Sequence, residues 1–199
     1  MTTVKTRRRP GLERVLATAD RLFYERGIHA TGVDLIAEEA SVSKATMYTY
    51  FRTKDDLVAA YLQGRSEGWQ RHVAEQLEAR GGSAIDKALS VFDLLGEWFV
   101  TDDFRGCPFI NAEAESAQDS PGHRVNLGHR GWVRELFADL LQPIGVTGSD
   151  EMLVLQLTTL YDGAMASAYA EPGPAWAHAA REAARGLIDR FEAEHSRVE

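Results

Sequence analysis

The sequence has a single cysteine, Cys107, among its 199 residues. One thiol cannot form an intrachain disulfide, so we expect a folded core to supply the stability and the compartment to be reducing. The N-terminal region lacks an apolar stretch of the signal-peptide type, and no run reaches the roughly 18 apolar residues that span a bilayer. These absences predict a cytoplasmic protein without a membrane partner.

Sequence motifs of common catalytic and metal sites are also missing. The chain has no nucleophile elbow, no phosphate-binding glycine loop and no zinc-ligand spacing, and no two of its six histidines stand four residues apart. We therefore expect that the protein is not an enzyme. We also expect no catalytic residues, no bound metal and no cofactor.

The net charge of −8 is distributed unevenly along the chain. Residues 1–54 hold ten Lys or Arg and six acidic residues, a local charge of +4. Binding to DNA depends on local neutralisation of phosphates, so this asymmetry predicts a basic, anion-binding N-terminal part on an acidic body. An ordinary basic tail is an alternative that charge alone leaves open.

Apolar residues recur at helical spacing along most of the chain, and strict two-residue alternation is absent. We therefore expect an all-α protein. The first helix should end near Arg26, before Gly27, which suits a left-handed helix stop. Later helices are expected at roughly 107–118, 124–142, 150–170 and 175–194, separated by breakers such as Ser120-Pro121-Gly122.

Two short helices are expected after residue 30. Thr31 and Asp34 fit a capping box for a helix that runs to Ala40, and Ser43 can cap the next helix. Only two residues lie between Ala40 and Ser43, and two short helices joined by so tight a turn form a helix-turn-helix.

A long amphipathic helix follows the helix-turn-helix. Thr53 and Asp56 fit a capping box, and the helix should run to about Arg80. Ser83 and Asp86 should cap the next helix in the same way. We expect a three-helix DNA-binding domain with a basic arm in residues 1–55, and a helical effector-binding and dimerisation domain in residues 56–199.

The stretch Val42–Lys54, together with Gly27, Thr31, Ile36, Ala37 and Ala40, resembles the N-terminal DNA-binding domain of the TetR family of bacterial regulators. The similarity covers about residues 11–61. The resemblance implies that Thr31, Tyr48 and Lys54 contact phosphates. It also implies that the C-terminal domain binds an inducer and that the short helix after residue 105 relays this binding.

The second helix of the motif can enter the major groove of double-stranded DNA, where its N-terminal side chains reach base edges. The residues expected there are Ser43, Lys44, Ala45 and Thr46. Tyr48 and Tyr50 offer hydroxyls to the DNA backbone, or one of them packs against the first helix.

Three consecutive arginines, Arg7, Arg8 and Arg9, precede the first helix. Such an arm can enter an adjacent minor groove or lie on phosphates. A solvated tail is the alternative.

Asn111 and Glu115 stand four residues apart, on one face of a short helix. Because buried polar groups need partners, they could anchor the polar part of a mostly apolar small-molecule effector. The apolar part would lie among aromatic and Met side chains: Phe92, Phe109, Trp132, Tyr161 and Met165. Alternatively, both polar residues face solvent or join two helices.

The last two expected helices are rich in small residues, which let helices approach closely. The seam of the last helix comprises Trp176, Ala180, Ala183, Leu187 and Phe191. A pair of this kind suits a four-helix interface of a symmetric homodimer, and packing within the chain is the alternative.

These features together predict a DNA-binding transcriptional repressor that a small molecule releases from its operator. Two alternatives remain open. One is a DNA-binding regulator without a ligand, and the other is a redox sensor that uses the Cys107 thiol.

Overall fold

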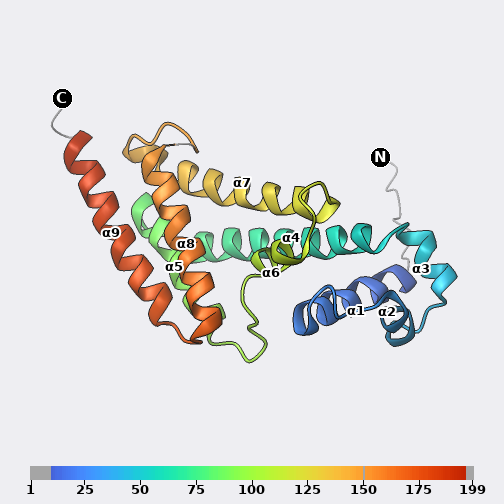
Figure 1. Ribbon diagram of the computed structural model, residues 1–199. Helices are drawn as coiled ribbons and strands as arrows, with labels where there is room; N and C mark the ends of the chain where they lie inside the picture. Colours follow the sequence, from blue (N-terminus) through green and yellow to red (C-terminus); the bar gives the residue numbers. More distant parts are fainter. Residues whose placement is uncertain (1–9, 150, 196–199) are drawn as a thin grey trace. The chain divides into compact units, whose positions relative to one another are not determined.

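The computed structural model describes residues 10–149 and 151–195, and within them it contains helices and no strand, as predicted. Figure 1 shows the helices: α1 (Pro10–Arg26), α2 (Val33–Glu39), α3 (Lys44–Tyr50), α4 (Lys54–Arg80), α5 (Ala84–Phe99), α6 (Pro108–Glu115), α7 (Pro121–Leu141), η1 (Gln142–Ile144), α8 (Met152–Ala170) and α9 (Ala175–His195). The all-α prediction is therefore confirmed.

By packing, the chain divides into two units. The first comprises the residues up to Gly64 together with Asn111–Val125, and the second comprises Arg65–Ile110 together with the residues from Asn126 onward. Three helices, α4, α6 and α7, contribute residues to both units. The predicted functional division at residue 55 stays a prediction.

A small apolar core holds α1, α2 and α3 together in the first unit. One face of α1 is buried, and both short helices pack on it. The buried side chains of this core include Val15, Ala19, Leu22, Phe23, Ile36, Ala37 and Met47. Because α2 and α3 have only seven residues each, tertiary packing rather than helix propensity must stabilise them.

The turn between α2 and α3 confirms the predicted helix-turn-helix. Ser41 adopts a left-handed conformation with φ of +52°, which is uncommon for a residue other than glycine. Ser43 caps α3, as predicted, by accepting a hydrogen bond from the Thr46 amide at 3.0 Å. Arg14 of α1 also supports the turn, because its guanidinium donates to the carbonyl oxygens of Ala40 at 2.9 Å and Ser41 at 3.4 Å.

The predicted capping box at the start of α2 is wrong. Gly32 is the N-cap residue, and no side chain caps the helix there. The Thr31 side chain is instead fully buried, and its hydroxyl lies 3.2 Å from the Leu22 carbonyl oxygen and 2.8 Å from that of Gly27. A buried hydroxyl needs an internal partner, and these two backbone carbonyls provide it.

The segment around Pro121 begins a helix rather than only breaking the chain. Proline suits the first turn of a helix, where its missing N–H would have no helical partner. The Ser120 hydroxyl accepts a hydrogen bond from the His123 amide at 3.1 Å, which caps α7. The capping boxes predicted for α4 and α5 are both confirmed.

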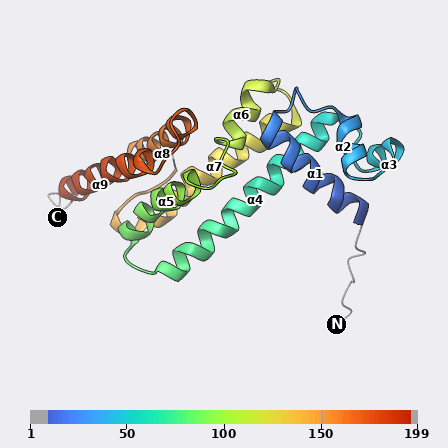
Figure 2. The same cartoon turned by 90° about the horizontal axis from the view of Figure 1, so that it is seen from below.

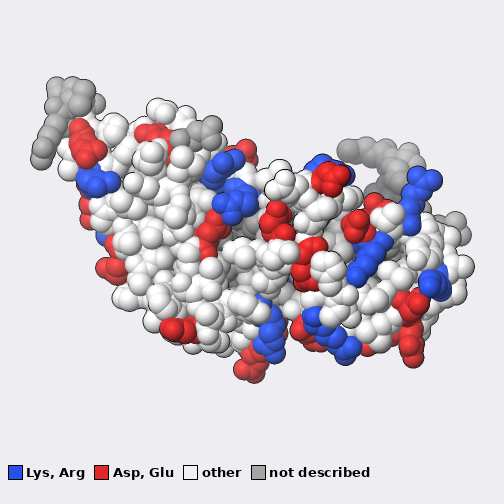
Figure 3. Space-filling model, in the orientation of Figure 1, with Lys and Arg blue, Asp and Glu red and all other residues white. Residues whose placement is uncertain are grey.

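In the second unit α8 and α9 run side by side, and α9 also packs on α5 (Figures 1 and 2). Much of the surface over α8 and the neighbouring side of α9 is uncharged in Figure 3. At the contact of α5 with α9 the chain is tightly packed, since a Cβ on Gly96 would lie 3.2 Å from the Cβ of Ala177. Close helix packing therefore organises this unit.

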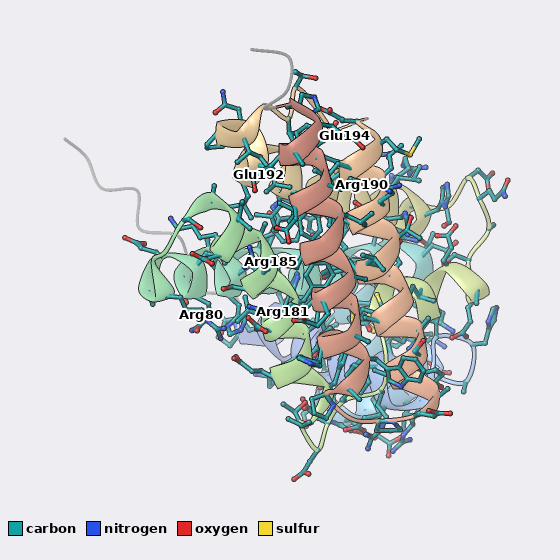
Figure 4. The ribbon with its side chains drawn as sticks, turned by 90° about the vertical axis from the view of Figure 1, so that its left-hand side faces the viewer. Arg80, Arg181, Arg185, Arg190, Glu192 and Glu194 are labelled. Carbon is teal, nitrogen blue, oxygen red and sulfur yellow. The ribbon has the colours of Figure 1, made fainter. Side chains whose placement is uncertain are left out.

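Ion pairs line the contact between α5 and α9. Arg181 lies 3.1 Å from Asp93, and Arg185 lies 3.7 Å from Asp86. Figure 4 shows both arginines on the side of α9 that faces α5. Surface pairs of this kind contribute only about 0–1 kcal/mol each to the free energy of unfolding, so the apolar contacts of α5 with α9 matter more for stability.

Two glycines with left-handed φ provide a test of packing in the second unit. A Cβ on Gly106 (φ +81°) would lie 2.8 Å from Cδ2 of Tyr169, whereas a Cβ on Gly145 (φ +100°) would meet no described atom within 4 Å. We expect Gly145→Ala to lower the free energy of unfolding by about 1 kcal/mol, from backbone strain alone. Gly106→Ala should cost about 1–3 kcal/mol more, because the ring must move. Equal losses in urea denaturation would contradict this packing.

Candidate nucleic-acid interface and effector region

The first turn of α3 presents polar side chains outward. Ser43, Lys44 and Ala45 are exposed and Thr46 is half-buried, whereas Met47 lies in the core. The Ser43 and Thr46 hydroxyl oxygens are 2.7 Å apart, so each side chain limits the rotation of the other. A short helix with such an exposed N-terminal turn has the dimensions and donors to enter a major groove.

Lys44 has an anionic partner within the first unit. Its Nζ lies 2.6 Å from Oδ1 of Asp34, and this hydrogen bond raises the pKa of the lysine. Both side chains are well exposed, so the pair is a weak surface interaction. A phosphate or a guanine acceptor could therefore take the place of the Asp34 carboxylate.

The two tyrosines of α3 have different surroundings. The Tyr48 side chain is exposed, at 43% of its full area. Tyr50 is half-buried against the start of α1, where a Cβ on Gly11 would lie 3.0 Å from its hydroxyl oxygen. Tyr50 therefore packs against the first helix, and Tyr48 is the more accessible to a DNA backbone.

Two of the residues that were expected at phosphates have contacts within the protein. The Lys54 ammonium donates to the carbonyl oxygen of Ile28 at 2.6 Å. Thr31 is fully buried, so its hydroxyl is inaccessible to DNA in this structure. The predicted arginine arm, Arg7–Arg9, lies outside the described residues.

The residues predicted for the effector are divided between the two units. Those in the second unit are half-buried Trp132 and the buried side chains of Phe92, Phe109, Tyr161 and Met165. Asn111 and Glu115 belong to the first unit, where Glu115 bonds to the loop after α1. The predicted set is therefore not one cluster within either unit.

His129 of α7 is buried, and no pattern in the sequence predicted this. Its Nδ1 lies 2.9 Å from the Ser66 hydroxyl, which also accepts from the Gln70 amide at 3.0 Å. Its ring stacks on Phe109 with ring centres 3.7 Å apart. Burial, assisted by the charge of Arg130, lowers the pKa of His129 to about 4, so the ring is neutral at pH 7. Such polar groups among aromatic rings could anchor a small molecule.

Cys107 and Tyr161 are also buried and uncharged in the second unit. Burial raises the pKa of the Cys107 thiol to about 11. Burial likewise raises the pKa of the Tyr161 hydroxyl well above its ordinary value. Because the thiolate is the reactive form of cysteine, Cys107 is poorly suited to oxidation at neutral pH.

Within residues 10–149 and 151–195, no three His, Cys, Asp or Glu side chains gather as metal ligands would. Across the same residues, none of the helices combines the length and the apolar composition that a membrane span requires.

The tight turn, the exposed face of α3 and the attached helical unit together define a helix-turn-helix regulator. A sequence profile described as "Bacterial regulatory proteins, tetR family" matches residues 15–61. SCO4454, a TetR-family transcriptional regulator from Streptomyces coelicolor, is 31% identical with a TM-score of 0.81, over 92% of this chain and 96% of that chain. The chain therefore belongs to the TetR family.

Other relatives support this assignment, but their alignments cover less of each protein or have a lower sequence identity. The HTH-type transcriptional repressor NemR of Escherichia coli K12 is 27% identical over 61% of this chain and 62% of NemR. An HTH-type transcriptional regulator of Lactococcus lactis is 26% identical over 66% of this chain and 65% of that protein. Both alignments thus span less than two thirds of the relative. The multidrug binding protein EbrR, complexed with malachite green, has a TM-score of 0.67 at 24% identity over 88% of this chain and 96% of that chain, which shows the fold alone.

The neutral state of His129 predicts how stability depends on pH. Its pKa of about 4 in the folded protein is below the ordinary value of 6.5. The unfolded chain therefore binds the extra proton first as the pH falls, and the folded state loses up to about 3 kcal/mol between pH 6.5 and 4. His129→Gln should remove this part of the pH dependence in urea denaturation. His178→Gln, at an exposed histidine of α9, is the control and should keep the parent's slope.

Proposed function

We propose that this protein is a homodimeric transcriptional repressor that binds operator DNA through α3 and is released by a small molecule. The exposed N-terminal turn of α3 is the main support for the proposed DNA binding. It directly follows the tight α2–α3 turn, to which Arg14 of α1 donates a hydrogen bond. A helix presented in this way suits reading of base edges in the major groove.

The proposed roles follow the exposure of each side chain. Ser43, Lys44, Ala45 and Thr46 would face base edges or phosphates, and Tyr48 would donate to the DNA backbone. Tyr50 and Lys54 would add backbone contacts only if they leave their partners in the first unit. The buried Thr31 is not part of the proposed interface. The arginine arm, Arg7–Arg9, is still proposed to contact DNA, and this proposal rests on the sequence alone.

Thr46 is the best test of base reading. We expect Thr46→Ala to weaken operator binding by about 1–3 kcal/mol, roughly 5- to 150-fold, with little change on random DNA. The operator is first selected by the parent protein from a pool of random duplexes, and affinities are measured by fluorescence anisotropy. Thr49→Ala is the matched control, because it removes an exposed hydroxyl from the same helix farther from its N-terminus. Equal losses on both DNAs would contradict base reading by Thr46.

A second copy of the chain is the proposed partner of α8 and α9. Small residues make up part of their exposed surface: Thr159, Gly163, Ala166 and Ala170 on α8, and Ala179, Ala183 and Gly186 on α9. Three large apolar side chains, Met152, Tyr169 and Trp176, are exposed there as well. A hollow of about 260 Å³ between the two helices is bordered by Trp176. A pair of adjacent helices that exposes small and apolar side chains suits a two-fold axis. Such a dimer would set the spacing of the two reading helices.

Ala183→Arg should separate the dimer. Ala183 is exposed in the chain, so the substitution should be tolerated by the fold, but it would place a bulky and unpaired charge in the proposed interface. Analytical ultracentrifugation should show a monomer, while circular dichroism stays that of the parent. Ala79→Arg, at an exposed alanine of α4, is the control and should leave the mass unchanged. If the Ala183 variant is a dimer of unchanged affinity, this surface is not the interface.

The proposed effector is a mostly apolar molecule that binds in the second unit. Buried aromatic residues, together with the neutral groups of His129 and Tyr161, support this chemistry. Asn111 remains an expected contact, whereas Glu115 is engaged with the loop after α1. The ligand can lower operator affinity only if it binds the DNA-free form more tightly.

A thiol-based sensor receives less support. The structure of NemR that resembles this fold, with a TM-score of 0.77 at 21% identity, is described as a reduced form. In this chain the Cys107 thiol is buried and its pKa is raised to about 11, which disfavours a reactive thiolate. A regulator without any ligand remains the other alternative.

A further inference from the structure

The loop between α1 and α2 is held by a carboxylate from a distant part of the chain. Glu115, the last residue of α6, accepts hydrogen bonds from the backbone amides of Ile28 at 3.1 Å and His29 at 2.6 Å. The same carboxylate lies 2.9 Å from Nδ1 of His29. All three residues belong to the first unit, so this contact is internal to it.

The contact is built for an ionised carboxylate. Burial opposes ionisation, but the amides of His29 and Ile28 and the His29 ring outweigh it and lower the pKa of Glu115. Hydrogen bonds between amides and an ionised oxygen are stronger than those between neutral groups. Glu115 therefore holds the loop as an anion at neutral pH.

The backbone around Ile28 is shaped for this contact. Gly27 has a left-handed φ of +89°, and a Cβ there would lie 3.2 Å from Oε1 of Glu115, so a side chain would crowd the carboxylate. Lys54 of α4 donates to the Ile28 carbonyl oxygen at 2.6 Å. Ile28 is thus held at its N–H by an anion and at its C=O by a cation.

The helix that carries Glu115 is itself anchored at its other end. Phe109 of α6 belongs to the second unit, where it stacks on His129. Glu115 stands six positions after Phe109, near the opposite end of the eight-residue helix α6.

We infer that Glu115 is a positioning residue, which orients the helix-turn-helix by fixing the two peptide groups that lead from α1 into α2. This inference rests on the proposed function, because it assigns one residue to the orientation of the proposed reading helix. The contact is made to backbone groups, so it fixes the path of the chain rather than any side chain. Removal of the carboxylate makes the loop more mobile, and the orientation of α3 on its operator becomes less well defined.

Amide exchange measures the contact directly in the full-length protein. In Glu115→Ala the amides of Ile28 and His29 should exchange roughly tenfold faster than in the parent, by NMR-detected hydrogen exchange. Glu113→Ala is the matched control, because Glu113 lies on the same helix but pairs with His123 of α7 at 2.7 Å. Glu115→Gln keeps the size of the side chain and should give an intermediate rate. Unchanged exchange in both Glu115 variants overturns the inference.

DNA binding measures the consequence. With the operator selected by the parent protein, Glu115→Ala should bind roughly fivefold more weakly, while its circular dichroism at 25 °C and its affinity for random DNA stay those of the parent. Glu113→Ala should bind as the parent does. If the parent selects an operator and Glu115→Ala binds it equally well, only this inference fails. If the parent selects no sequence, the proposed function fails, and the exchange rates still report whether Glu115 holds the loop.

Discussion

The helix-turn-helix depends on hydrogen bonds from side chains to loop backbone groups. Its two short helices share only a small apolar core, so the turns between elements must be held by other means. Arg14 bonds to the carbonyls of the α2–α3 turn, the buried Thr31 hydroxyl bonds to the carbonyls of Leu22 and Gly27, and Lys54 and Glu115 hold the Ile28 peptide groups. These bonds give partners to backbone groups of the loops, and together they fix where α3 lies within the first unit.

The helices and most of their caps were predictable because they depend on neighbouring residues. Ser43 caps α3 through an amide three residues away, and Gly27 ends α1 through its own backbone conformation. The Thr31 prediction failed because capping competed with the carbonyl of Leu22 in α1 and with that of Gly27 in the loop after α1. The partner of Glu115 was unpredictable from spacing, since His29 lies 86 residues away in the sequence. Contacts over such separations depend on tertiary packing, which leaves no local pattern.

Three buried polar groups of the second unit are uncharged because they are buried. His129, Cys107 and Tyr161 each have a pKa shifted toward the uncharged form, and aromatic rings surround the first of them. An interior of this kind favours apolar molecules that offer one or two hydrogen bonds over strongly charged ones.

The contact of Glu115 with peptide groups has a consequence for how the sequence can vary. Position 29 contributes its amide, and its exposed imidazole adds to a bond that the backbone already makes. Many amino acids could therefore replace His29 without loss of the backbone contact, whereas proline could not, because it has no N–H. Among related sequences, selection would act on the acidic residue at the end of α6 and on the glycine that makes room for it. The loop that they hold would be free to diverge at its exposed position.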